Sequence, residues 1–300
     1  MCMDQPQDPE RRASQRTAAA RRRSRRWRRH RPPLWRILTA PFRVLPDFLV
    51  IGAQKGGTTS LFDDLVQHPS VICPYTKEAQ FFNRRLRCTL CYRGYFPSRY
   101  MVWRARRRIG QPVLTGEATP EYLFHPAVPA RVHRLLPRAR LVVLLRDPIA
   151  RAFSHYQHMR RAGNEPLGFE EAIAAEPKRL KGLQELAEKA PLTELTALQH
   201  YSCGARGIYV TQPRRWLTYY SREQVFIGFS EELFESLRTV FDRVCRFLGL
   251  EQWAPRFRVS NSGGYREAIS EQTRERLTAF YAPYNRELEN LLGCPVPWGY

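Results

Sequence analysis

The sequence has no uninterrupted apolar run long enough to cross a bilayer. Its most apolar early stretch, residues 34–53, is broken by Arg36, Arg43, Asp47 and two prolines, whereas a transmembrane helix needs about 20 consecutive apolar residues. The basic start of the chain is also not followed by the apolar segment of a secretory signal. We therefore expect neither a transmembrane segment nor a signal peptide.

Paired cysteines are scarce as well. Among the seven cysteines only Cys88 and Cys91 form a Cys-x-x-Cys pair, and neither a second pair nor histidines at ligand spacing accompany it. A zinc site requires such ligands, and an odd set of cysteines without framework spacing is typical of reduced thiols. We predict no metal site and a cytoplasmic location.

Acidic residues are few, with 28 Asp and Glu against 49 Lys and Arg and a net charge of +21. Residues 1–43 alone hold thirteen arginines and three acids, a net charge of +10. Such a segment buries too little apolar surface to fold. We predict a disordered Arg-rich arm over residues 1–43 and a folded domain over residues 44–300. The arm is either a solvated tail or a contact to nucleic acid, a polyanion or an anionic membrane surface.

Short apolar runs alternate with helical patterns in the folded part. The pattern predicts strands at 48–52, 113–114, 141–145 and 225–229 and helices at 58–66, 148–161, 231–248 and 271–292. Continuous apolar strands separated by helices are typical of a mostly parallel sheet with helices on both faces. The predicted fold class is therefore α/β. Residues 164–206 are polar and helix-prone, and we expect this insertion to face an acceptor.

The segment Gly52–Ser60 lies between the first strand and the first helix, where backbone N–H groups surround a phosphate. Its glycine spacing is that of the nucleotide-hydrolysing P-loop G-x-x-x-x-G-K-[ST], but Thr58 replaces the motif lysine and Lys55 precedes the second glycine. The strand ending at Leu145 runs into Arg146 rather than an acidic strand end. These differences predict a P-loop-like phosphate cradle without nucleotide hydrolysis, and they argue against a kinase-like phosphotransferase.

The sequence Gly-Ala-Gln-Lys-Gly-Gly-Thr-Thr-Ser of this loop resembles the phosphosulfate loop of sulfotransferases that use 3′-phosphoadenosine-5′-phosphosulfate (PAPS). It is most similar to the heparan sulfate, or carbohydrate, branch. The resemblance implies that Lys55 binds the 5′-phosphate and the transferring sulfuryl group and is a catalytic residue. The neighbouring cofactor-binding residues would be Gly56, Gly57, Thr58, Thr59 and Ser60.

Two further segments extend the resemblance. Leu144–Tyr156 is similar to the family's 3′-phosphate element, which implies that Arg146 and Ser154 hold that phosphate; a guanidinium binds a phosphate with two parallel hydrogen bonds. Asn261–Arg266 resembles the loop that closes over the same end of the nucleotide. It implies cofactor contacts from Gly264, Tyr265 and Arg266.

The segment Lys77–Asn83 resembles the one that carries the catalytic glutamate in heparan-type enzymes, and it implies that Glu78 is the general base. The sequence departs from the family at Ala118, where a lysine is usual. We expect Lys77 or another base to compensate, or else a different acceptor geometry. His155 and His158 are alternative bases, since cytosolic small-molecule sulfotransferases use a histidine.

The predicted activity is transfer of a sulfuryl group from PAPS to a hydroxyl or amino group of an acceptor, with adenosine 3′,5′-bisphosphate as the product. The resemblance favours a carbohydrate acceptor. A lipid, a peptide tyrosine or a small-molecule alcohol remains an alternative, and nucleic-acid binding through the Arg-rich arm is a competing role from a different class.

Overall fold

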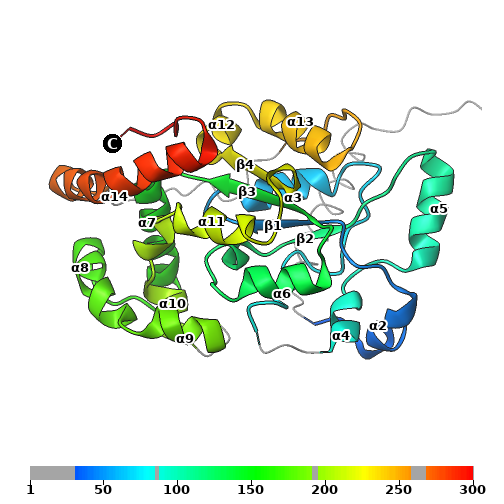
Figure 1. The fold of residues 1–300 in the computed structure, drawn as a ribbon, viewed down its shortest axis with the longest axis horizontal. Helices are drawn as coiled ribbons and strands as arrows, with labels where there is room; N and C mark the ends of the chain where they lie inside the picture. The colour runs from blue at the N-terminus through cyan, green and yellow to red at the C-terminus, as the bar shows by residue number, and fades with distance from the viewer. Residues whose placement is uncertain (1–30, 85–87, 191–194, 258–267, 300) are drawn as a thin grey trace, which may run out of the picture.

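The structure is a computed structural model that describes residues 31–84, 88–190, 195–257 and 268–299. A four-stranded sheet lies at its centre, formed by β1 (Phe48–Gly52), β2 (Gly116–Ala118), β3 (Arg140–Leu145) and β4 (Val225–Phe229). The strand order is β2-β1-β3-β4, and every pair is parallel (Figure 1). The predicted parallel α/β fold is confirmed.

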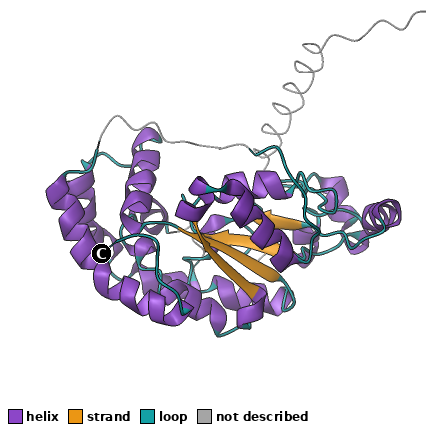
Figure 2. Ribbon diagram, turned by 90° about the horizontal axis from the view of Figure 1, so that it is seen from above, coloured by secondary structure: helices purple, strands orange, loops and turns teal. Residues whose placement is uncertain are grey.

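Alternate residues of the strands pack against opposite faces of this sheet. Phe48 and Val50 point toward α3 (Thr58–Leu65), α12 (Ser230–Glu235) and α13 (Leu237–Leu248). Leu49 and Ile51 point toward α6 (Val128–Leu135), α11 (Thr211–Leu217) and α14 (Glu271–Leu292). Figure 2 shows helices on both sides of the strands, as the sequence predicts.

Two predicted elements differ from the structure. The second strand is not at 113–114 but at Gly116–Ala118, where the missing side chain of Gly116 leaves room for Phe48; a Cβ there would lie 2.6 Å from the phenyl ring. The helix predicted over 231–248 is interrupted at Ser236, whose backbone is extended and whose side chain accepts a hydrogen bond from the Thr239 N–H at the start of α13.

The end of the predicted arm is ordered, which corrects the predicted boundary at residue 43. Residues in this range form α2 (Leu34–Leu38) and the short 3-10 helix η1 (Ala40–Phe42). Arg36 donates to the carbonyl oxygens of Gly94 (2.7 Å) and Phe96 (2.8 Å), and Arg43, 4% exposed, donates to Phe96 O at 2.9 Å. Arginines that composition assigns to a solvated tail therefore hold this segment on the domain. Residues 1–30 lie outside the described part.

The insertion between β3 and β4 is helical. After α7 (Pro148–Arg161) it contains α8 (Phe169–Leu180), α9 (Leu183–Lys189) and α10 (Thr196–Tyr201), which lie together at one end of the molecule in Figure 1. At the other end stand α4 (Thr89–Arg93) and α5 (Arg99–Ile109). Within the described residues, no helix combines the length and the apolar character that a bilayer crossing requires.

Candidate active site

The phosphate loop leaves the carboxyl end of β1 and turns back sharply into α3. The turn places Lys55 at φ 70° and Gly57 at φ 79°, both in the left-handed region. A Cβ on Gly56 would lie 2.6 Å from the carbonyl oxygen of Leu144, so only glycine fits against β3. The first turn of α3 therefore presents its N–H groups at the same end of the sheet, as an anion-binding site requires.

Side chains from two neighbouring strands hold this loop. Arg146, directly after β3, donates from Nη1 to the carbonyl oxygen of Lys55 at 3.0 Å. The Oγ of Ser230, directly after β4, lies 2.8 Å from Gly56 O and 2.9 Å from Leu145 O. No sequence motif identified above includes Ser230. Its position at a helix start immediately after an apolar strand was the available signal.

Lys77 connects the loop to the predicted general base. Its Nζ donates to Thr59 Oγ1 at 2.7 Å and lies 3.3 Å from Glu78 Oε1. The lysine is buried, whereas the Glu78 side chain is 35% exposed and so remains accessible to an acceptor. Ala118 lies against the same segment, because its N–H donates to Lys77 O at 2.8 Å. The backbone of Lys77 therefore lies beside Ala118, the position where the family lysine is absent, while its ammonium group contacts Thr59 and Glu78.

Positive charges converge on the loop. Burial lowers the pKa of Lys55, and the nearby charges of Arg161, Arg146, Arg151 and Lys77 lower it further. Like charges held this close favour an anion among them. Together with the glycine cradle, this donor set fits a phosphosulfate group held by Lys55 and the loop N–H groups. No group of His, Cys, Asp and Glu within the described ranges is arranged to hold a metal ion.

Glu117 lies beneath this site, and its hydrogen bonds indicate a structural role. It is fully buried and accepts hydrogen bonds from Tyr92 OH (2.6 Å), Thr119 Oγ1 (2.7 Å) and the Ala79 N–H (3.0 Å). Burial raises its pKa, although these hydrogen bonds oppose the shift. The carboxyl group thus anchors the backbone that follows Glu78 and is not accessible to an acceptor.

Glu121 carries a second buried carboxyl group, which the sequence does not predict. It accepts from Asn83 Nδ2 at 2.9 Å and from Gln199 Nε2 of α10 at 3.3 Å. Burial raises its pKa, the charge of Arg206 lowers it and that of Glu78 raises it. Glu121 therefore joins the Glu78 segment to the helical insertion. No local pattern predicts a contact between residues so far apart in the chain.

The two histidines considered as alternative bases, His155 and His158, have different environments in the structure. His155 is 1% exposed, its Nε2 lies 3.2 Å from the carbonyl oxygen of His200, and burial lowers its pKa. It faces α10 rather than the loop. His158 is exposed, and its pKa is lowered by partial burial and then by the charge of Lys55. Only His158 has an electrostatic link to the loop.

The other predicted cofactor contacts are Ser154 and three residues at 264–266. Ser154 lies on α7 and is 2% exposed. Its assignment to the 3′-phosphate stays a prediction, as do the roles of the loop residues and of Arg146. Gly264, Tyr265 and Arg266 lie outside the described residues.

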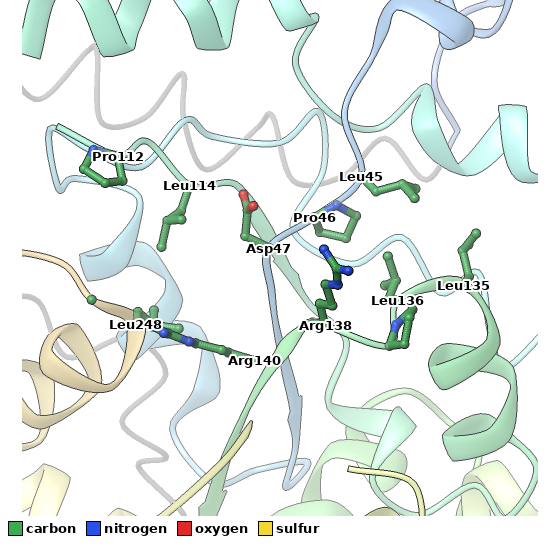
Figure 3. Close-up of a pocket in the computed structure, with 13 residues that line it drawn as sticks. Leu45, Pro46, Asp47, Pro112, Leu114, Leu135, Leu136, Arg138, Arg140 and Leu248 are labelled. Carbon is green, nitrogen blue, oxygen red and sulfur yellow. The ribbon is translucent and has the colours of Figure 1, made fainter. Parts of the chain in front are cut away.

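A groove of about 610 Å³ lies at the opposite end of the strands. Figure 3 shows Leu45, Asp47, Arg138, Arg140 and Leu248 among the residues that line it. Asp47 directly precedes β1 and Arg140 begins β3. Because nucleotides bind at the carboxyl ends of parallel strands, this groove is not the nucleotide site.

Comparison with known proteins agrees with the geometry of the loop. Residues 45–258 match the family model described as "Sulfotransferase domain". The chain is 32% identical over 293 residues to the human "Bifunctional heparan sulfate N-deacetylase/N-sulfotransferase 3", covering 84% of this chain and 31% of that protein. It therefore spans about a third of the length of that relative.

Two other relatives are covered over most of their length. The mouse "Heparan sulfate glucosamine 3-O-sulfotransferase 6" is 27% identical over 281 residues, which cover 85% of this chain and 74% of that protein. The crystal structure of a sulfotransferase from Alicyclobacillus acidocaldarius superposes with a TM-score of 0.64 at 30% identity, covering 84% of this chain and 98% of that one. The chain belongs to the sulfotransferase family.

Proposed function

We propose that this chain transfers the sulfuryl group of PAPS, the donor used by its family, to an amino or hydroxyl group of a glycan. The observation that carries the proposal is the bridge made by Lys77, which joins Thr59 of the phosphate loop to the partly exposed Glu78. This bridge brings a group suited to anion binding and a group suited to proton transfer to the same place.

Bound PAPS supplies the sulfuryl group: a new bond forms from the acceptor nitrogen or oxygen to sulfur, and the bond from sulfur to the 5′-phosphate oxygen breaks. Glu78 accepts the proton that the acceptor loses. Lys55 and the loop N–H groups neutralise charge on the sulfuryl oxygens and on the leaving 5′-phosphate. Arg146 is assigned to the 3′-phosphate and fixes the loop through Lys55 O at 3.0 Å.

The glycan class of the acceptor rests on the names of the relatives. Two of the relatives described above act, by name, on heparan sulfate, one as an N-deacetylase/N-sulfotransferase and one as a 3-O-sulfotransferase. A strongly basic chain is also suited to an anionic polymer. Gln199 of α10 donates to Glu121 at 3.3 Å, which links the helical insertion to the segment that carries Glu78 and supports a role of the insertion in holding the acceptor. We also propose a cytoplasmic location for the protein. Fractionation of intact cells would test this location.

The test measures sulfate transfer from labelled PAPS to three acceptors: N-deacetylated heparosan, the same polymer after N-acetylation, and a phenol. We expect transfer to a polysaccharide and little to the phenol. Preference for the N-deacetylated polymer identifies an amino acceptor, whereas equal transfer to both polymers identifies a hydroxyl. Transfer to the phenol alone would contradict the proposed glycan acceptor.

Replacement of Glu78 by Gln keeps its shape and removes its basicity, so turnover should fall by roughly 10²–10⁴-fold. Affinity for adenosine 3′,5′-bisphosphate, measured by calorimetry, should change little. Glu275→Gln, at an exposed position on α14, is the matched control and should have no effect. An active Glu78→Gln protein together with an inactive His158→Ala protein would assign the base to His158 instead.

A further inference from the structure

Exposed apolar side chains are concentrated in two short segments on either side of the phosphate loop in the sequence. Of the twelve large hydrophobic residues exposed among the described residues, eight lie within residues 34–42 and 90–103. The most exposed are Leu38 (71%), Leu34 (70%), Phe42 (70%), Tyr100 (65%) and Trp35 (57%). Scattered single exposures are ordinary, but a concentration of this kind indicates an interaction surface.

These residues belong to one continuous surface. Arg36 of α2 donates to the carbonyl oxygens of Gly94 and Phe96, which follow α4. Arg43, just after η1, forms a β-bridge with Ser98, the residue that caps α5. Helices α2 and α4 and the start of α5 therefore lie next to one another, and Figure 1 shows them at the same end of the molecule. We call this surface, formed by residues 34–43 and 89–108, the arginine–aromatic face.

The face is strongly cationic. The sequence has no Asp or Glu between Glu10 and Asp47, and none between Glu78 and Glu117. Helix α5 has only Val102 buried, and its arginines at 99, 104, 106, 107 and 108 are exposed. Asp47 lies near enough for the charge of Arg106 to lower its pKa against the effect of burial, but the two stretches themselves supply no acidic side chain, so the face attracts anions.

Arginines and aromatic rings are interleaved on this face. The guanidinium of Arg107 lies 5.1 Å from the Trp103 ring centroid, and that of Arg43 lies 5.2 Å from the Trp35 ring centroid. Tyr100 and Trp103 stack at 5.8 Å. Surfaces of this composition, with Trp, Phe and Leu beside arginine, lie in the boundary between lipid headgroups and acyl chains.

We propose that the arginine–aromatic face docks this protein onto an anionic lipid bilayer, with the arginines on headgroup phosphates and the apolar side chains among the acyl chains. A polyanionic glycan or a nucleic acid would satisfy the arginines, but neither offers a hydrocarbon phase to Leu34, Leu38 and Phe42. The face connects to the amino ends of β1 and β2, whereas the phosphate loop lies at their carboxyl ends. The proposed docking surface and the phosphate loop therefore lie toward opposite ends of these strands.

The test measures sedimentation of the full chain with vesicles of phosphatidylcholine, with and without phosphatidylserine. Wild type should bind the anionic vesicles far more strongly than the neutral ones. Leu38→Ser/Phe42→Ser keeps every charge and should weaken binding by about 10-fold or more. Arg104→Ser/Arg107→Ser should weaken it by roughly 10-fold. Sulfate transfer to a dissolved acceptor should stay at the wild-type level in both variants, since neither touches the loop.

Matched controls lie on the opposite part of the molecule. Leu186→Ser/Phe280→Ser removes two exposed apolar side chains, and Arg274→Ser/Arg276→Ser removes two exposed charges, so both should bind vesicles as wild type does. Unchanged binding of the Leu38→Ser/Phe42→Ser protein would overturn the proposal, because contact would then be through arginines alone. Binding to heparin without binding to anionic vesicles, or self-association abolished by the same variant, would also overturn it.

Discussion

At the scale of single residues, Lys55 and Lys77 are the two lysines of the site, and their side chains have different environments. Lys77 is fixed on Thr59 and beside Glu78. Lys55 is half-buried in the loop, and its lowered pKa reflects first its burial and then the cations around it. An anion that neutralises those cations favours the charged form of Lys55. Binding of a phosphosulfate group and protonation of Lys55 are therefore coupled.

The role of Lys55 predicts the turnover of Lys55→Ala and the pH dependence of its affinity for the bisphosphate. Turnover at saturating PAPS should fall on the order of 10²-fold, by the loss expected for a donor that stabilises transition-state charge. In the wild type, bisphosphate affinity should fall as pH rises through the lowered pKa, below the ordinary lysine value of 10.5, because only the ammonium form attracts phosphate. This alkaline loss should be reduced in the variant. Lys178→Ala, at an exposed lysine, is the control, and unchanged Lys55→Ala turnover would remove the assignment.

The residues that carry chemistry were more predictable than those that support them. Lys55, Arg146 and Glu78 stand in local motifs, and the structure places them at one end of the sheet. Glu117 and Glu121 could not be distinguished from accessible carboxylates, because their environment comes from Tyr92 and Gln199, which are distant in sequence. The burial of a polar side chain depends on such contacts and not on the residues adjacent to it in the sequence.

At the scale of elements, the junction between β4 and α12 determines the shape of the phosphate loop. Ser230 lies within hydrogen-bond distance of one carbonyl of the loop and one of β3. Ser230→Ala leaves both without this partner, which should cost about 1–2 kcal/mol of unfolding free energy. It should also weaken bisphosphate binding several-fold, because the loop loses its anchor at Gly56.

Ser236→Ala provides the matched control for this element. It removes the side-chain cap of α13 and should cost about 1 kcal/mol of stability, but it should leave bisphosphate affinity unchanged. Denaturant unfolding and calorimetry measure the two quantities separately. Equal affinities for the two variants would show that Ser230 supports the fold alone.

The elements themselves follow from the sequence to different degrees. The strand at 225–229 and the helices at 148–161 and 271–292 have the predicted bounds, because their apolar runs are long and their ends carry caps, proline or glycine. The interruption at Ser236 was missed because the apolar spacing continues through it. The order of residues 34–43 was missed because it depends on Arg36 and Arg43 reaching carbonyl oxygens more than fifty residues away.

At the scale of the whole molecule, the positive charge of the chain attracts anions, and the parallel sheet brings the predicted site residues together. All four strands direct their carboxyl ends to one side, so the loop after β1, Arg146 after β3 and Ser230 after β4 meet there. The arginine–aromatic face lies toward the other ends of β1 and β2. A molecule this basic attracts many anions weakly, and selectivity for one nucleotide has to come from the geometry of the loop.

Ligand-dependent thermal unfolding tests that selectivity in the intact chain. Adenosine 3′,5′-bisphosphate at about a hundredfold excess over its Kd should raise the Tm by roughly 5 °C or more, because a ligand bound only to the native state stabilises it. ATP should raise the Tm far less, since its phosphates extend from one position of the ribose and leave the 3′-phosphate contact unmade. Arg146→Ala should reduce the bisphosphate shift more than the ATP shift, because the variant loses the proposed 3′-phosphate contact as well as the hydrogen bond to Lys55 O that both nucleotides depend on. Equal shifts for the two nucleotides in wild type would mean that the loop binds phosphate without recognising this donor.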